Sequence, residues 1–203
     1  AFLLKETYSN PEQSIKRDMI KDFKQLFKPE PNVRGLYIVW ALDSFTWGCF
    51  IPIRSALLSD YFHFTPTEIG LVLATTYAVV SLTSIPLGNL ADRVDRRAVL
   101  CASEVIAGLS LIGYMLSSTL NQVILLQVLN GISLATWFGP IQSLVADSVP
   151  ERKMGKAMGS LFAISIIVSL PSPTLGGLIY AYLGFSSLGW FILILTILDT
   201  MLI

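Results

Sequence analysis

The order of apolar and polar positions divides the chain into long apolar runs joined by short polar segments. Six runs approach or exceed the ~20 residues that a helix needs to cross the hydrocarbon core of a bilayer. They lie at residues 35–58, 67–90, 98–118, 121–146, 156–183 and 187–203. Their apolar residues follow one another instead of alternating, which favours transmembrane helices over transmembrane strands. The pattern predicts an all-α membrane protein with a bundle of six transmembrane helices.

Small residues and prolines add detail to two of these runs. Small side chains let membrane helices approach closely, so we expect close packing at Gly70, Ala74 and Ala78 in the second run and at Gly155, Gly159 and Ala163 in the fifth. Pro171 and Pro173 interrupt the fifth run and predict a kink there.

The composition agrees with a membrane protein and excludes several function classes. Hydrophobic residues make up 53% of the chain and charged residues only 14%, whereas soluble domains carry about 25% charged residues. The formal net charge is zero, so nothing indicates a nucleic-acid partner. Cys49 and Cys101 lie inside apolar runs without metal-ligand spacing, so we interpret them as packing residues and expect no metal or cofactor. No Gly-x-x-x-x-Gly-Lys-Ser/Thr sequence indicates ATP binding.

Basic residues are confined almost entirely to alternate connections. Thirteen of the fourteen lysines and arginines lie in the leader up to Arg34, between the second and third runs, or between the fourth and fifth. Because basic residues are retained on the cytoplasmic side, this distribution predicts a multi-pass protein of the plasma (cytoplasmic) membrane with a cytoplasmic N-terminal segment. Arg54 is the exception, and we expect its side chain to snorkel outward to the membrane surface.

Residues 1–34 form a separate region, which we interpret as a cytoplasmic linker. Ile15, Met19, Phe23 and Phe27 recur every four residues, with basic residues between them. Two interpretations remain open. The segment is either an amphipathic helix on the inner membrane surface or a solvated linker helix with an ordinary apolar stripe.

Residues 88–97 hold five charges within six residues, between the second and third runs. The segment reads Gly88-Asn89-Leu90-Ala91-Asp92-Arg93-Val94-Asp95-Arg96-Arg97. It resembles the Gly-x-x-x-Asp-Arg-x-Gly-Arg-Arg signature of the major facilitator superfamily and lies where that family has it. Two further segments are similar to motifs of the family: Asp147-Ser148-Val149-Pro150-Glu151-Arg152-Lys153-Met154-Gly155 after the fourth run, and Pro173-Thr174-Leu175-Gly176-Gly177 in the fifth.

The chain also departs from the family pattern at several positions. Asp95 replaces the usual glycine of the signature, and Met154 replaces a usual arginine in the second motif. The fifth-run motif lacks glycines at Val168 and Ser172, which weakens the case for the antiporter subtype.

The resemblance implies that residues 35–203 form one six-helix half, built as a 3+3 repeat, of a twelve-helix transporter. The other half would then be a partner, because the substrate cavity of the family lies between the halves. The opening residues Phe2-Leu3-Leu4-Lys5-Glu6-Thr7 look like the end of a sixth helix followed by the central linker. Gln127 also stands where an amino-terminal half often has arginine. Both features favour the carboxy-terminal half; the alternative is an amino-terminal half with a cytoplasmic extension.

The resemblance also assigns a gating role to charges on the predicted cytoplasmic side. In the family, such a network holds the inner gate closed in the outward-facing state. The matching residues here are Gly88, Asp92, Arg93, Arg96, Arg97, Asp147 and Arg152. The alternative is a hydrated charge cluster that only sets topology.

Ionisable residues within apolar runs are expensive, about 2.5–3.5 kcal/mol each at a helix centre on insertion scales. Asp43 is the main candidate, because it shares a helix face with Trp40 and Trp47. It would exchange a proton or pair with a cationic substrate; the alternative is a buried structural acid. Glu104 is a second candidate, with pairing to the nearby basic turn as its alternative. Asp199 is expected near a cytoplasmic helix end.

The fourth run adds a polar and aromatic stripe that includes Gln127, Asn130, Ser133 and Trp137. By resemblance, the first and fourth helices of each half line the substrate cavity. The candidate substrate or proton site therefore consists of Asp43, Trp47, Glu104, Asn130 and Trp137, with interhelical packing as the alternative role of each polar residue.

These features favour a secondary active transporter of a small solute, which works by alternating access and is coupled to an ion, with the proton favoured. A non-transporting scaffold or receptor of the same fold remains an alternative. An intramembrane enzyme is disfavoured, because His63 lies in an outer connection and the acids lack a paired-acid motif. The expected partners are the bilayer, a small-molecule substrate and the second half.

Overall fold

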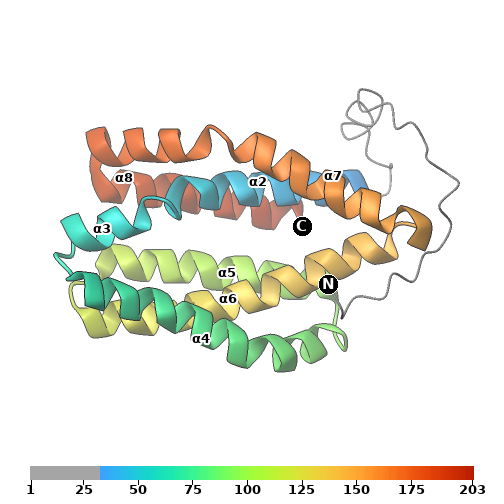
Figure 1. Cartoon of the computed structure of the whole chain (residues 1–203), viewed down its shortest axis with the longest axis horizontal. Coiled ribbons are helices and arrows are strands. Elements are labelled where there is room, and N and C mark those ends of the chain that lie inside the picture. Colours follow the sequence, from blue (N-terminus) through green and yellow to red (C-terminus); the bar gives the residue numbers. More distant parts are fainter. Residues whose placement is uncertain (1–32) are drawn as a thin grey trace, which may run out of the picture.

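The computed structural model describes residues 33–203, and these residues form helices joined by short turns, with no strand among them. The helices run side by side along the long axis of the molecule (Figure 1). Their bounds are α2 (Arg34–Phe50), α3 (Arg54–Asp60), α4 (Pro66–Ala91), α5 (Arg96–Leu116), α6 (Leu120–Asp147), α7 (Glu151–Ser169) and α8 (Ser172–Leu202). The predicted amphipathic helix in the leader lies outside the described residues.

Within residues 33–203, five helical stretches are long and apolar enough to cross a membrane. They are Arg34–Asp60, Pro66–Ala91, Arg96–Leu116, Leu120–Asp147 and Glu151–Leu202. Large apolar side chains stay exposed along them, such as Leu82, Ile85 and Leu116, each more than three-quarters exposed. Lipid, rather than water, suits such a surface. The all-helical membrane architecture predicted from the hydrophobic runs is therefore confirmed.

The last stretch is too long for a single straight crossing. Its 52 residues would extend about 78 Å as one helix, against a hydrocarbon core of about 30 Å. The helix ends at Ser169 and restarts at Ser172, beside the prolines that predicted a kink. A second break lies at Gly184, whose φ of 80° and ψ of 175° suit glycine because it lacks a Cβ. In Figure 1, α8 turns back on itself, and its red part returns beside α2.

Polar side chains define where the helices begin. Thr65 and Glu68 form a capping box at the start of α4, with the Thr65 N–H donating to Glu68 Oε2 over 2.8 Å. Thr119 and Gln122 form the same arrangement at the start of α6. The Arg97 N–H donates to Asp95 Oδ1 over 3.1 Å, so Asp95 caps α5. Each cap satisfies backbone N–H groups that the first turn leaves unpaired. Asp95, the departure from the family signature, thus has a local structural role.

The helices pack as two groups that meet where α5 contacts α8. α4 and α5 pack on α6, while α7 and α8 pack on α2, and α5 meets α8 between the groups. Apolar side chains gather in two clusters. One surrounds Trp40, Trp137 and Ile141, and the other surrounds Leu57, Leu111 and Leu188. The candidate site residues lie on α2, α5 and α6, which also contribute to these clusters.

The closest helix contacts are not at the predicted glycines. A Cβ built on Gly70, Gly155 or Gly159 has no other atom within 4 Å, so the expected close approach is wrong there for the described residues. A Cβ on Gly176 would instead overlap the carbonyl of Cys49. Gly176 therefore lets α8 lie directly against the backbone of α2. Glycine in the Pro-x-x-Gly-Gly segment is required by this contact.

Candidate functional site

A cavity of about 420 Å³ opens between α2, α4, α5 and α6. All five residues of the predicted substrate or proton site line it: Asp43, Trp47, Glu104, Asn130 and Trp137. The volume falls within the range of small-molecule pockets. Residues from three helices therefore meet at one cavity, although none is adjacent to another in the sequence.

Aromatic rings form much of the cavity wall. Trp40 and Trp137 meet edge to face, with ring centroids 5.0 Å apart and planes at 70°. Phe162 packs on the other side of Trp40, at 5.1 Å. These contacts link α2, α6 and α7 and hold the rings in defined positions. Aromatic faces attract cations and stack with flat ligands, so the wall is suited to an aromatic or cationic solute.

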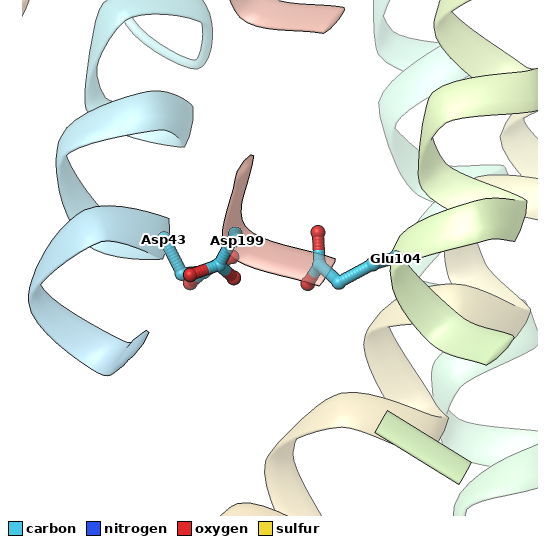
Figure 2. Close-up of side chains that lie close together, drawn as sticks. All are labelled: Asp43, Glu104 and Asp199. Carbon is cyan, nitrogen blue, oxygen red and sulfur yellow. The ribbon is translucent and has the colours of Figure 1, made fainter. Parts of the chain in front are cut away.

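The carboxyl groups of Asp43, Glu104 and Asp199 converge from three helices (Figure 2). One oxygen from each lies within 4.8 Å of the others. Glu104 is 2% exposed and Asp199 is 1% exposed. Figure 2 shows the side chains of Asp43 and Asp199 meeting, with Glu104 reaching toward them from α5. The helices thus bring three acids together in the apolar interior.

Asp199 is the functional candidate that sequence reasoning missed. Asp199 was expected near a cytoplasmic helix end, but its carboxyl lies beside that of Asp43. Asp43 follows the first turn of α2 by about six residues, so this position is well inside the helix. Both carboxylate oxygens of Asp199 are buried and accept no hydrogen bond. The alternative for Glu104, pairing with the basic turn, is also not seen, since among residues 33–203 no ion pair involves it.

Two indoles lie beside this acid cluster, which we define as Asp43, Glu104 and Asp199. The indole of Trp47 lies beside the Asp43 carboxyl, and the indole of Trp137 lies beside the Glu104 carboxyl. The Trp137 Nε1 is buried but completes no hydrogen bond. An indole N–H is a donor only, so a small shift of either ring would let it stabilise a carboxylate.

Arg54 is at the cavity wall. Its side chain lines the cavity from the start of α3, and its Nε is buried without a hydrogen-bond partner. The expectation that its guanidinium snorkels outward stays a prediction. The turn at residues 51–53 redirects the chain and brings Arg54 to the cavity wall. The cavity consequently carries a guanidinium as well as carboxyl groups.

Two polar residues of α6 contact neighbouring helices. The hydroxyl of Thr76 donates to Gln127 Oε1, and Gln127 is fully buried. The hydroxyl of Ser133 donates to the carbonyl of Ser103 over 2.8 Å. These bonds join α6 to α4 and to α5. Gln127 thus has a packing role, whereas Asn130 stays at the cavity.

The charged signature connects two turns of the chain through a single arginine. Arg96 forms an ion pair with Asp147 at the end of α6, and a second with Asp92 at 3.6 Å. Among the described residues, no ion pair within 4 Å involves Arg93, Arg97 or Arg152. Gly88 lies in the last turn of α4, with open space around it. The α4–α5 turn is thereby tied to the α6–α7 turn.

Comparison with known proteins agrees with this architecture. The family model described as Major Facilitator Superfamily matches residues 36–203. The multidrug resistance protein MdtG of Escherichia coli is 31% identical over 161 residues, which cover 72% of this chain and 37% of that protein. An MFS-type transporter of Methanocaldococcus jannaschii is 28% identical over 163 residues, covering 78% of this chain and 41% of the relative.

A third relative, an MFS-type transporter of Schizosaccharomyces pombe, is 28% identical over 148 residues, covering 70% of this chain and 33% of that protein. The chain thus spans between a third and about two-fifths of the length of these relatives. The matches agree with the charged signature and the helical architecture. This chain belongs to the major facilitator superfamily of membrane transporters.

Proposed function

We propose that the chain is one six-helix half, the carboxy-terminal one, of a secondary active transporter that moves a small solute by alternating access and is coupled to protons. The observation that carries this proposal is the cavity, because it combines an aromatic wall with the acid cluster in a membrane helix bundle. Family membership supports the transport class. The partial coverage of the relatives supports a second half that would complete the cavity.

The topology we propose has six crossings, arranged as three plus three. The two breaks in Glu151–Leu202 support it, since the turn at Gly184 separates a fifth crossing from a sixth. Residues 1–34 then form a cytoplasmic linker, and the charged turns face the cytoplasm because they carry the basic residues. The plasma membrane is the compartment that we propose.

Asp43 is the residue that we propose to exchange the proton. Its side chain lines the cavity and also belongs to the acid cluster. It therefore lies between the proposed substrate space and the buried carboxyls of Glu104 and Asp199. Carboxylates this close repel one another, and a proton removes part of that repulsion. When the cavity opens to the opposite side of the membrane, water enters from that side and changes how strongly the carboxyl groups hold a proton. Such a change would load protons on one side and release them on the other.

The solute that we propose is a small aromatic cation. The rings of Trp40, Trp47 and Trp137 offer flat, electron-rich faces, and Asp43 offers a negative charge. MdtG carries the name multidrug resistance protein, which is compatible with a solute of this kind. Asn130 would orient the solute through its amide.

The Arg96 ion pairs are the gate that we propose. The pair with Asp147 ties the α4–α5 turn to the α6–α7 turn, so it must break before the two turns separate, while the pair with Asp92 holds Arg96 within its own turn. Since Arg96 is 28% exposed and Asp147 is 67% exposed, water competes for both groups. A pair of this kind contributes about 0.2–1 kcal/mol, which is small enough to open during a transport cycle.

The test uses the full-length protein in proteoliposomes, with ethidium as the probe because it is a fluorescent aromatic cation. We expect a pH gradient to drive ethidium transport and Asp43→Asn to reduce the driven rate at least ~10-fold, within the range of general acid–base effects. Asp60→Asn is the matched control, because Asp60 is exposed and lies outside the cavity.

Three results would contradict parts of this proposal. Ethidium transport that ignores the pH gradient would remove proton coupling. Gradient-driven transport that persists unchanged in Asp43→Asn would remove Asp43 from the proton path. No transport of ethidium or of other small aromatic cations would favour the scaffold or receptor alternative.

A further inference from the structure

The acid cluster has the geometry of a metal site. Oxygens that lie within 4.8 Å of one another are close enough to share one ion, because two ligands of an ion are at most twice the bond length apart. For Ca²⁺, with bonds of 2.3–2.6 Å, that limit is about 4.6–5.2 Å. For Mg²⁺, with bonds of 2.0–2.1 Å, it is about 4.0–4.2 Å. The upper bound of 4.8 Å therefore admits a divalent cation, and Ca²⁺ fits over its whole range.

A second observation points to a ligand at this position. Asp199 is 1% exposed, and neither of its carboxylate oxygens has a hydrogen-bond partner. Buried polar groups in folded proteins are almost always paired with protein, water or an ion. Figure 2 shows the Asp199 carboxyl directed into the cluster rather than toward another helix surface. No ion pair among residues 33–203 supplies a cationic side chain to Asp43, Glu104 or Asp199.

The donor set indicates which cation would bind. All three ligands are carboxylates, without histidine or cysteine, and hard oxygen donors select Ca²⁺, Mg²⁺ or Mn²⁺ over softer metals. Three negative charges also favour a divalent cation over a monovalent one. Asp43 and Glu104 line the cavity, so the remaining coordination positions of an ion would face space that admits water.

From these observations we infer that Asp43, Glu104 and Asp199 bind one divalent cation, such as Ca²⁺. The cation would replace protons on the same oxygens, so metal and proton would compete for the cluster. From the sequence we expected no metal, because Cys49 and Cys101 lack metal-ligand spacing. The inference deepens the proposed proton role because it uses the same carboxyl groups, but cation binding itself requires no transport.

The experiment measures Mn²⁺ binding to the purified, chelator-treated full-length protein by electron paramagnetic resonance, with Ca²⁺ as the competitor. We expect one saturable Mn²⁺ per chain, displaced by Ca²⁺ and bound more tightly at higher pH. Asp199→Asn and Glu104→Gln should each weaken binding at least ~10-fold, as the loss of even supporting groups does at metal sites. Asp60→Asn, an exposed acid elsewhere, should leave the affinity unchanged.

The result that overturns the inference is an affinity equal to that of the parent protein in both Asp199→Asn and Glu104→Gln. Absence of saturable Mn²⁺ binding in the monodisperse parent protein at pH 8 would overturn it equally. Asp199→Glu, which keeps a carboxylate, should restore part of the binding and separates ligand loss from misfolding. Proton-driven ethidium transport without Mn²⁺ binding would reject only the cation site. Mn²⁺ binding without any transport would reject only the transport proposal.

Discussion

Two groups of charged residues in this protein differ in almost every physical respect. Arg96, Asp92 and Asp147 join exposed turns, with opposite charges already paired. Asp43, Glu104 and Asp199 meet inside the helix bundle, with like charges and, among residues 33–203, no ion pair to a cationic side chain. The exposed group can lower its energy by pairing, whereas the buried group depends on a proton, a cation or water. The first is therefore suited to holding turns together, and the second to binding.

Removal of a buried acid should have the largest effect on stability. Whether stability rises or falls shows whether the carboxyl is paired. In chelator, Asp199→Leu should raise the free energy of unfolding by about 1–3 kcal/mol, because an unsatisfied buried polar group is lost. Thermal unfolding of the full-length protein in detergent measures this. Asp147→Asn at the exposed group should instead lower stability slightly. A fall in stability for Asp199→Leu would mean that its carboxyl is already well paired.

The cap at Asp95 should give an intermediate effect, and it tests how the exposed turn is built. Asp95→Ala should lower stability by about 0.5–2 kcal/mol, since the first turn of α5 loses its acceptor. Asp95→Gly, which restores the glycine of the family signature, should cost only a few tenths of a kcal/mol. Chemical denaturation in detergent compares the two. Equal losses would show that the charge of Asp95, rather than its capping bond, matters.

The pair between Arg96 and Asp147 should give the smallest effect. A double-mutant cycle with Arg96→Gln and Asp147→Asn should measure a coupling of about 0.2–1 kcal/mol that falls as salt is added. Arg97→Gln in place of Arg96→Gln is the matched control and should show no coupling to Asp147, because no ion pair involves Arg97 in the described residues. A coupling energy that does not fall with added salt would mean that this pair is shielded from solvent, as the buried acids are.

Local patterns in the sequence were sufficient for the family and for the helical membrane architecture. The hydrophobic runs and the charged signature are each made of consecutive residues, so both can be recognised without a structure. Asp43 and Trp47 could be selected because an acid and aromatics share a helix face. The resemblance placed Asn130 and Trp137 of the fourth run at the same cavity, whereas Glu104 was selected only as an acid within an apolar run.

Asp199 and Arg54 could not be placed in that way. Asp199 joins the acid cluster only because α8 turns back at Gly184 and packs on both α2 and α5. Arg54 reaches the cavity because the turn after α2 redirects the next helix. Both depend on contacts between distant segments, and helical periodicity contains no information about those contacts. The proposed sixth crossing and the linker remain predictions for the same reason.

The contact between Gly176 and the backbone at Cys49 gives the protein an internal reporter. Cys49 has no exposed surface, and α8 covers its carbonyl through a glycine. A thiol reagent is expected to reach this sulfur when the seam between α2 and α8 loosens, whereas Cys101 on α5 is only partly buried. The alkylation rate of Cys49 relative to Cys101 therefore counts openings of that seam, without any label introduced by mutation.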